Sequence, residues 1–230
     1  MMRNDSNIDL NSEIPIVYES FYSQSDVVYS KIIESLRDIS TNFRVGPIGF
    51  PRSIKENECI QISGKYSELH DWTSGVYKCS DSSFSKLPSF LSKEIFVYAD
   101  YKHFGDIFPE NDVPSINIWK NIGLNTITDL ESTIWYGSKS SHTPLHYDSY
   151  GYNIVVQLHG IKNWKLWRPG SLNGSEKRIP YEESSVYSEY DPLKNDEDTQ
   201  LPVPDFDIVL KAGDVLIVPK HWWHFVITVF

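Results

Sequence analysis

The stretch His142-Thr143-Pro144-Leu145-His146-Tyr147-Asp148 holds two side chains with the chemistry to bind a metal ion. On a β-strand, residues two apart point to the same side, so His146 and Asp148 project together while Tyr147 turns away. A second histidine from elsewhere would complete the two-histidine, one-carboxylate face that holds non-haem Fe(II) and leaves coordination positions open. The triplet alone is a weak signal, because it also arises by chance as a strand-end histidine and a surface aspartate.

Two candidates for the second histidine follow near the end of the sequence. The dipeptide Gly213-Asp214 opens an apolar run that Pro219 ends, and His221-Trp222-Trp223-His224-Phe225 comes next. Because His221 and His224 differ by three positions, they would face opposite sides of one strand and cannot both be ligands. Periodicity does not choose between them. Either one also reads as an ordinary, partly buried histidine beside aromatic residues, and for His221 we favour that interpretation.

Lys162 is the third unusual residue. If the run Gly160–Leu166 is a strand, Lys162 lies on the same face as Trp164 and Leu166. A lysine on an apolar face needs an anion, because such charges are rarely buried unpaired. The side chain either extends to solvent from the start of the strand or supplies a point charge for the carboxylate of a ligand.

At these residues the sequence resembles the JmjC/cupin-type 2-oxoglutarate oxygenases. Within that family it is most similar to members associated with small heat-shock proteins, and less similar to the asparaginyl and lysyl protein hydroxylases. The resemblance covers about residues 90–227 well and the first 80 residues poorly. Its blocks are His142–Asn163, Arg178–Ser188 and Gly213–Phe225, together with Tyr98–Lys102 and Glu131–Gly137. Three separated motifs in the family's order are far more specific than any one of them.

The resemblance implies a role for each matching position in binding the metal. His146 and Asp148 match the family's H-x-D ligands, and His224 matches its distal histidine, which excludes His221 as a ligand. The implied ion is Fe(II).

The resemblance also implies a binding site for 2-oxoglutarate. Lys162 matches the lysine that pairs with the C5 carboxylate, and Thr143 matches a threonine that hydrogen-bonds the same group. Strict alternation along a strand would point Thr143 away from His146, so we expect Pro144 to introduce an irregularity, since proline cannot donate to a β-ladder. Asn153 matches an asparagine that lines the site, and Tyr98 is a further candidate partner of the carboxylate.

The function implied is an Fe(II)- and 2-oxoglutarate-dependent oxygenase that hydroxylates a protein or peptide, or demethylates it through hydroxylation. The alternative is a catalytically silent JmjC scaffold that binds a chaperone-type partner such as a small heat-shock protein. A complete set of three ligands plus Lys162 favours the enzyme. Lys162 and the Asp148 ligand also disfavour a cupin-like protein that uses another metal without 2-oxoglutarate.

The elements that must position these residues can be read from hydrophobic periodicity. A helix is expected over 26–39 with Ser25 as its N-cap, and a second over 101–108 after Asp100, with Tyr101, Phe104 and Phe108 on one face. Strands are expected at 94–98, 132–137, 145–148, 153–159, 161–167, 207–210, 214–218 and 223–229. This pattern predicts a mainly β fold, a jelly roll with N-terminal helices. The resemblance implies that the roll is the double-stranded β-helix of the JmjC/cupin family.

The expected organisation is one JmjC-type domain over 14–230, with a helical N-terminal third and the jelly roll from about residue 94. Residues 1–13 are polar and expected to be frayed. The acidic segment 189–205, with Asp196-Glu197-Asp198 at its centre, is expected to be a solvated loop. Family members continue beyond the position of Phe230, so we expect the strand that closes the roll to be missing.

Composition narrows the class of partner. A net charge of −10 argues against direct nucleic-acid binding, which needs clustered lysine and arginine. The sequence lacks a signal peptide and an apolar run long enough to cross a bilayer, and its two cysteines, Cys59 and Cys79, suit a reducing compartment. We therefore expect a cytoplasmic or nuclear protein with no membrane partner; its oligomeric state is not predicted.

Overall fold

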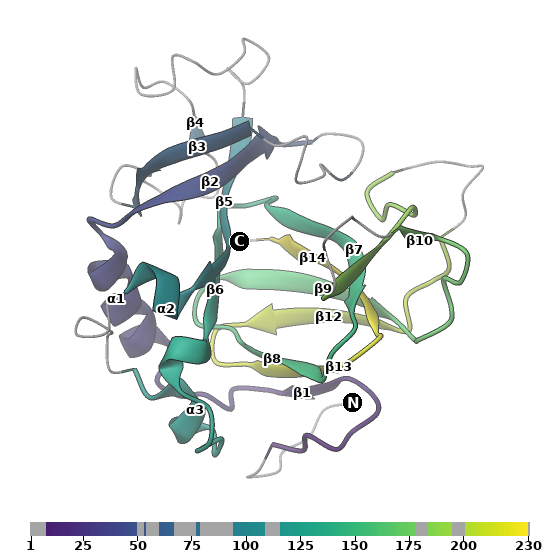
Figure 1. The fold of residues 1–230 in the computed structure, drawn as a ribbon, viewed down its shortest axis with the longest axis horizontal. Coiled ribbons are helices and arrows are strands. Elements are labelled where there is room, and N and C mark those ends of the chain that lie inside the picture. The colour runs from purple at the N-terminus through teal and green to yellow at the C-terminus, as the bar shows by residue number, and fades with distance from the viewer. Residues whose placement is uncertain are drawn as a thin grey trace.

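Two antiparallel β-sheets face each other and form the body of the domain (Figure 1). The computed structural model describes residues 8–49, 53, 60–66, 77–78, 94–108, 116–177, 184–194 and 201–229. Over these residues the larger sheet runs, in order, β10 (Glu176–Lys177), β11 (Ser185–Ser188), β7 (His142–Asp148), β14 (Trp223–Thr228), β9 (Ile161–Trp167) and β12 (Phe206–Lys211). The smaller sheet runs β1 (Ile16–Tyr18), β13 (Val215–Pro219) and β8 (Tyr152–Val156). This arrangement confirms the mainly β, cupin-like jelly roll.

The space between the two sheets is filled by alternate residues of their strands. In β9, Trp164 and Leu166 point inward, and they pack with Leu210 of β12 and Val226 of β14. From the smaller sheet, Leu216 and Val218 of β13 meet them, with Val17 of β1 beside Leu216. A side-chain period of two thus gives each strand one face toward this core.

A third sheet and the helices pack on one side of the roll (Figure 1). The sheet contains β3 (Ile60–Lys65), β2 (Ser40–Pro47), β5 (Glu94–His103) and β4 (Tyr77–Lys78), with β6 (Thr133–Gly137) also paired to β5. The helices are α1 (Ser25–Leu36), α2 (Phe104–Ile107) and α3 (Ile118–Asn121), with a 3₁₀ turn, η5, at Asp129–Glu131. Their apolar residues share a second core with the outer face of the smaller sheet, so the roll and its flanking elements form one packed unit.

Helix α1 covers most of the predicted span, but both of its ends differ from the prediction. Val28, Ile32 and Leu36 are buried, as the helical spacing indicates. Ser25 is the first helical residue rather than the cap; Gln24 takes the cap position without a side-chain hydrogen bond. The helix ends at Leu36 because the chain pairs as β2 from Ser40 onward.

The expectations of a helical N-terminal third and of a helix over 101–108 need correction. The described residues up to 78 hold one helix and four strands, β1 to β4. Strand β5 continues to His103 through an irregularity between Ala99 and Lys102, where Tyr101 has φ +50°. Helix α2 therefore begins at Phe104; Phe104 and Phe108 are buried together as expected, whereas Tyr101 is 53% exposed.

The predicted strands are otherwise found with small shifts of their ends. The prediction 161–167 coincides with β9, while β7 begins three residues earlier than predicted and β8 ends three residues earlier. Strands β1 to β4, β10 and β11 were not predicted. Among the short ones, β1 pairs with β13, β11 pairs with β7, and β10 pairs with β11.

Two segments expected to be loose are anchored where the structure describes them. Within 1–13, Ile8 and Leu10 pack against the core, and the indole of Trp222 donates to the carbonyl of Glu13 at 3.0 Å. Within 189–205, Asp191 accepts two hydrogen bonds from Ser53, and the indole of Trp167 donates to the carbonyl of Pro202. Residues 1–7, the central Asp196-Glu197-Asp198, residues 178–183 of the Arg178–Ser188 block, and both cysteines lie outside the described residues.

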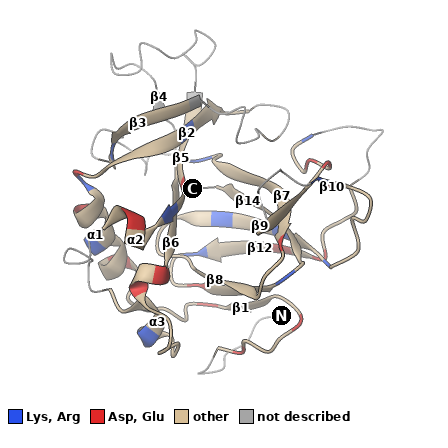
Figure 2. Ribbon diagram, in the orientation of Figure 1, with Lys and Arg blue, Asp and Glu red and all other residues tan. Residues whose placement is uncertain are grey.

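Charged residues are unevenly distributed over the fold. Figure 2 shows many of them on the helices and connections; within the roll, β9 carries Lys162 and Lys165, and β12 carries Asp207 and Lys211. Within the described ranges, no helix is long and apolar enough to cross a membrane. The expectation that the strand closing the roll is missing remains a prediction.

Candidate metal centre

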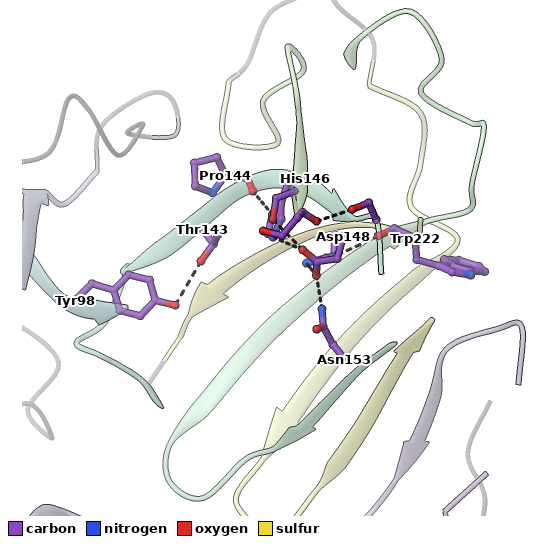
Figure 3. Close-up of polar contacts among 11 residues, drawn as sticks. Tyr98, Thr143, Pro144, His146, Asp148, Asn153 and Trp222 are labelled. Carbon is purple, nitrogen blue, oxygen red and sulfur yellow. Dashed lines mark hydrogen bonds and ion pairs between the residues drawn. The ribbon is translucent and has the colours of Figure 1, made fainter. Parts of the chain in front are cut away.

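The three predicted metal ligands meet on the inner face of the larger sheet. His146 and Asp148 lie at the end of β7, side by side in Figure 3, and His224 on β14 pairs directly with His146. Nε2 of His146 is 4.0 Å from Oδ1 of Asp148, and Nε2 of His224 is 3.7 Å from Oδ2. One ligand atom from each residue lies within 4.8 Å of the other two, and all three residues are buried. The three atoms are close enough to contact one ion.

Main-chain carbonyl groups orient both histidine rings. Nδ1 of His146 lies 2.8 Å from the carbonyl oxygen of Pro144, and Nδ1 of His224 lies 3.0 Å from that of Trp222 (Figure 3). Since a carbonyl oxygen can only accept, Nδ1 carries a proton in each ring, which leaves Nε2 as the nitrogen that can bind a metal. Metal-binding histidines are commonly held in this way. The same device, a carbonyl two residues earlier in the chain, occurs on both strands.

Asp148 is held in its charged form by two donors. Nδ2 of Asn153, from the facing sheet, donates to Oδ2 (Figure 3), and Oγ of Ser185 on β11 donates to Oδ1 at 3.0 Å. Burial raises the pKa of Asp148, but the neighbouring imidazoles of His224 and His146 and these two hydrogen bonds outweigh it, so the pKa lies below its ordinary value. The centre therefore offers two imidazole nitrogens and one carboxylate, a donor set that suits Fe(II).

A β-bulge in β7 resolves the expected conflict at Thr143. Across from β7, His224 pairs with His146 and Val226 pairs with Thr143, so Pro144 and Leu145 together face the single residue between them. The extra residue shifts the alternation by one position. Thr143 consequently lies on the inner face with His146, as the irregularity at Pro144 predicts.

Thr143 and Tyr98 form the hydroxyl part of the site expected for 2-oxoglutarate. The hydroxyl of Tyr98 lies 3.4 Å from Oγ1 of Thr143 (Figure 3). Burial raises the pKa of Tyr98 to about 12, although its hydrogen bond to Thr143 and the charge of Arg44 oppose the shift. The tyrosine hydroxyl therefore keeps its proton at neutral pH and can donate it to an anion. Gly137 leaves room for the ring: a Cβ there would lie 2.7 Å from its Cδ2.

Lys162 lies on the same face as Trp164 and Leu166, as the alternation predicts, and its ammonium turns toward Tyr98. Its Nζ lies 5.7 Å from the centre of the Tyr98 ring and donates to the carbonyl oxygen of Trp135 on β6 at 3.0 Å. Burial lowers the pKa of Lys162 to about 8. A neutral carbonyl does not balance the charge, which leaves this lysine suited to an anionic ligand.

His221 lies apart from the centre. It is exposed at φ +68°, and its ring packs edge-on against Tyr147, with ring centres 5.6 Å apart. The expectation that its partners are aromatic is met, but the expected partial burial is not. The tight turn before β14 places its side chain outside the roll, while its backbone N–H donates to the carbonyl of Asp148.

Sequence reasoning missed Ser185 as a partner of Asp148. Ser185 lies in a block that the family resemblance covers, and β11 places it opposite Asp148 in antiparallel register. A serine beside another serine, on a strand of four residues, carries no periodic signal of its own. Asn153, by contrast, was placed near the site by the resemblance, and the structure shows it in contact with Asp148.

A two-sheet antiparallel roll, with two histidines and a carboxylate directed into it, defines the cupin class of protein. Residues 51–229 match the family model of the cupin-like domain. The chain therefore belongs to the JmjC/cupin-like family.

Similar proteins place the chain further within this family. It is 37% identical over 180 residues to mouse (Mus musculus) HSPB1-associated protein 1, which covers 74% of this chain and 36% of that protein. It is 34% identical over 98 residues to the Arabidopsis thaliana protein "Lysine-specific demethylase JMJ30" (40% of this chain, 22% of that protein). It is 29% identical over 139 residues to the Gallus gallus protein "2-oxoglutarate and iron-dependent oxygenase JMJD4" (53% and 31%). The match thus spans about a third of the length of HSPB1-associated protein 1.

Proposed function

We propose that the chain is an Fe(II)- and 2-oxoglutarate-dependent oxygenase that hydroxylates a protein or peptide side chain. Demethylation is the special case in which an N-methyl carbon is hydroxylated. The observation that carries the proposal is the convergence of His146, Asp148 and His224, with both Nε2 atoms and the carboxylate directed at one point. The similarity to the Gallus gallus relative, which is named a 2-oxoglutarate and iron-dependent oxygenase, supports it.

The roles of the residues follow from their contacts. His146, Asp148 and His224 would hold the iron on one side and leave other positions open. Asn153 and Ser185 would keep Asp148 ionised and fix which oxygen faces the ion. When bound, the iron and 2-oxoglutarate would supply electrons that activate O₂ for the oxidation of a substrate C–H bond. The chain itself contributes geometry, charge and exclusion of water.

Lys162, Thr143 and Tyr98 would bind the distal carboxylate of 2-oxoglutarate. The carboxylate would replace the neutral carbonyl of Trp135 as the partner of the Lys162 ammonium and raise the pKa of that lysine from about 8. The two hydroxyl groups lie within reach of each other and can donate to the same anion. These three residues come from β9, β7 and β5, so the site depends on the packing of β5 against the roll.

The test is an anaerobic titration of the purified chain with Fe(II) and then 2-oxoglutarate, following the visible charge-transfer band of the complex. We expect the band in the wild type and in Lys165→Ala, a control on the same strand whose ammonium pairs with Asp207 on the outer side. Asp148→Ala should show no band because iron is lost, and Lys162→Ala should need far more 2-oxoglutarate. Folded wild-type protein that binds iron but shows no band would sink the oxygenase proposal.

We also propose a small heat-shock protein as a partner, because the mouse relative is named for its association with HSPB1. This observation favours the second candidate function, a scaffold without turnover. Titration of purified HSPB1 against the wild type and Asp148→Ala distinguishes the two functions. Equal binding by both, combined with the absence of a charge-transfer band, would favour the scaffold; no binding by either would remove the partner.

A further inference from the structure

Tyr187 on β11 contacts the metal ligand His146 from the side opposite to His224, because β11 and β14 flank β7 in the sheet. It pairs directly with His146 across the antiparallel register of β11 and β7, so both side chains point to the inner face. The two rings are nearly parallel, at 23°, with centres 5.4 Å apart. The ring centre of His224 lies 4.1 Å from that of His146, at 59°. The His146 imidazole therefore lies between two rings.

The second ligand histidine has a similar neighbour. The ring of Trp164 on β9 lies 5.7 Å from that of His224, at 30°. Because β11, β7, β14 and β9 are consecutive in the sheet, four rings follow one another across it, and the two metal ligands are the inner pair. Trp164 belongs to the apolar core between the sheets, so core packing accounts for its place. Tyr187 is half-buried and belongs to no apolar cluster of the described residues, so its contact with His146 calls for another explanation.

The orientation of the His146 ring is only partly fixed by its hydrogen bond. The carbonyl oxygen of Pro144 holds Nδ1, but one hydrogen bond leaves the ring free to tilt about it. A precise metal site needs ligand rings that are locked by packing as well. A nearly parallel tyrosine ring restricts this tilt, and its electron-rich face is attracted to an imidazole that shares the positive charge of a bound cation. The contact therefore becomes more favourable when a metal ion binds.

We propose that Tyr187 is a positioning residue of the metal centre, whose ring holds the His146 imidazole in the orientation that directs Nε2 at the ion. The inference rests on the proposed function, because it needs a divalent metal ion at the three ligands. Strand β11 then contacts the centre twice, through Ser185 at Asp148 and through Tyr187 at His146. The segment between β9 and β12 thus contributes to metal affinity without supplying a ligand.

Chelator competition with Zn(II) measures this contribution without turnover. Tyr187→Leu removes the flat ring, and we expect it to weaken Zn(II) binding about tenfold, the lower end of the range for outer partners of metal ligands. Tyr187→Phe keeps the ring and should stay within about twofold of the wild type. Tyr190→Leu is the matched control, because this tyrosine follows in the same segment but packs against the outer apolar cluster. It should bind Zn(II) as the wild type does.

The visible absorption of the Co(II)-loaded protein provides a second readout, because its ligand-field bands report the geometry of the ligands. A tilted His146 ring should shift and broaden these bands in Tyr187→Leu, while Tyr187→Phe and Tyr190→Leu keep the spectrum of the wild type. If Tyr187→Leu does not fold, Tyr187→Met takes its place. Methionine is flexible enough to fill the space but offers no flat face to the imidazole, so the same loss of affinity and the same spectral change are expected.

The outcomes separate the two proposals. If the wild type binds Zn(II) and Co(II) no better than Asp148→Ala does, the proposed function fails. If the wild type and Tyr187→Leu bind Zn(II) equally, the proposed function stands and the role of Tyr187 is overturned. Equal losses in Tyr187→Leu and Tyr187→Phe would assign the effect to the hydroxyl group and overturn the role of the ring. A weaker affinity with an unchanged Co(II) spectrum would also overturn it, because the ligand geometry would then not depend on Tyr187.

Discussion

The inner and outer faces of β7, β14 and β9 differ although they belong to the same strands. The outer face is closed by an apolar cluster that the segment after β9 covers, and its central residues are about 1% exposed: Leu145, Trp167, Leu172, Val186, Trp223 and Phe225. The inner face, at the same level of the sheet, buries His146, Asp148 and His224, and further along β9 it carries Lys162. The outer face is therefore a packed apolar cluster, whereas the inner face buries polar and charged groups.

The two faces differ in whether their buried polar groups have hydrogen-bond or charge partners. In the outer cluster, the indole of Trp167 has an acceptor. On the inner face, the ammonium of Lys162 contacts a neutral carbonyl, and the indole of Trp164 lacks a partner in the ranges described. A buried group without its natural partner costs stability. The packed outer face can offset that cost, and the inner face then gains from binding a ligand.

The largest effect is expected from a substitution that removes a metal ligand and leaves the apolar cluster of the outer face intact. Asp148→Ala takes away the carboxylate ligand and leaves the two imidazoles, so the affinity for Fe(II) should fall by more than about 100-fold, beyond the usual effect of losing an outer hydrogen-bond partner. Anaerobic equilibrium dialysis measures it. A mutant affinity within about tenfold of the wild type would mean that Asp148 does not bind the metal.

A substitution within the apolar cluster of the outer face should instead lower the free energy of unfolding. Trp223 is 1% exposed and contacts Tyr147 edge-on, with ring centres 4.6 Å apart. Trp223→Ala should lower the free energy of unfolding by about 3–5 kcal/mol, because a large cavity remains. Urea denaturation tests this against Val209→Ala, an exposed strand residue expected to change stability by less than about 0.5 kcal/mol. Similar losses in both variants would contradict the comparison.

Removing a hydrogen-bond donor to Asp148 should have an intermediate effect, a moderate loss of metal affinity. Asn153→Ala deletes the donor to Oδ2 of Asp148 and should weaken metal binding by about 10- to 100-fold without abolishing it. Chelator competition provides the measurement. Ser185→Ala removes the donor to the other oxygen and should fall in the same range. Unchanged affinity in both variants would show that the two imidazoles alone hold the carboxylate.

The smallest effect is expected for the contribution of Lys162 to the free energy of unfolding when no ligand is bound. Because the pKa of Lys162 in the folded chain is lowered to about 8 from an ordinary 10.5, the unfolded chain binds the proton more tightly. The contribution of this residue to stability therefore rises as pH increases from about 8 to 10.5 and is unfavourable below that window.

Lys162→Met should remove this pH-dependent contribution and raise the free energy of unfolding at pH 7 by roughly 1 kcal/mol, allowing for partial exposure. Urea denaturation of both proteins at pH 7 and pH 10 measures the effect. Tyrosines that titrate near pH 10 contribute equally in both proteins, so the difference between the two proteins reports Lys162 alone. A destabilised Lys162→Met protein at pH 7 would show that the ammonium already has an adequate partner.

The sequence predicts the inner face better than the elements around it. Alternation alone places Lys162 with Trp164 and Leu166, and the predicted strand coincides with β9, because a long strand buried on one face has a clear period of two. The same reasoning fails for β2, whose Arg44, Gly46 and Pro47 do not suggest a strand. Arg44 is nevertheless buried there, 2.7 Å from Asp100, an ion pair that no local pattern reveals.

Within the candidate site, local spacing could bring together His146 and Asp148, but it could not choose between His221 and His224. That choice came from family resemblance, and the structure agrees because the turn at His221 directs its ring outward. The irregularity at Pro144 is predicted only because the family resemblance assigns Thr143 to the same face as His146. Ser185 depended on a pairing between strands far apart in the sequence, and single-residue patterns do not report such pairings.

The pairing of β1 with β13 has a consequence for how the chain reaches its fold. Ile16 lies opposite Ile217, so the smaller sheet closes through a contact between segments separated by about 200 residues. Contacts of this span are slow to form, because the entropy of closing the loop is lost before the contact is gained. During synthesis, the apolar residues of β1 must wait for nearly all of the described chain, with their hydrogen-bonding edge unpaired. The nascent protein is therefore exposed to aggregation until β13 emerges, and its yield in cells should depend on helpers that shield the early segments.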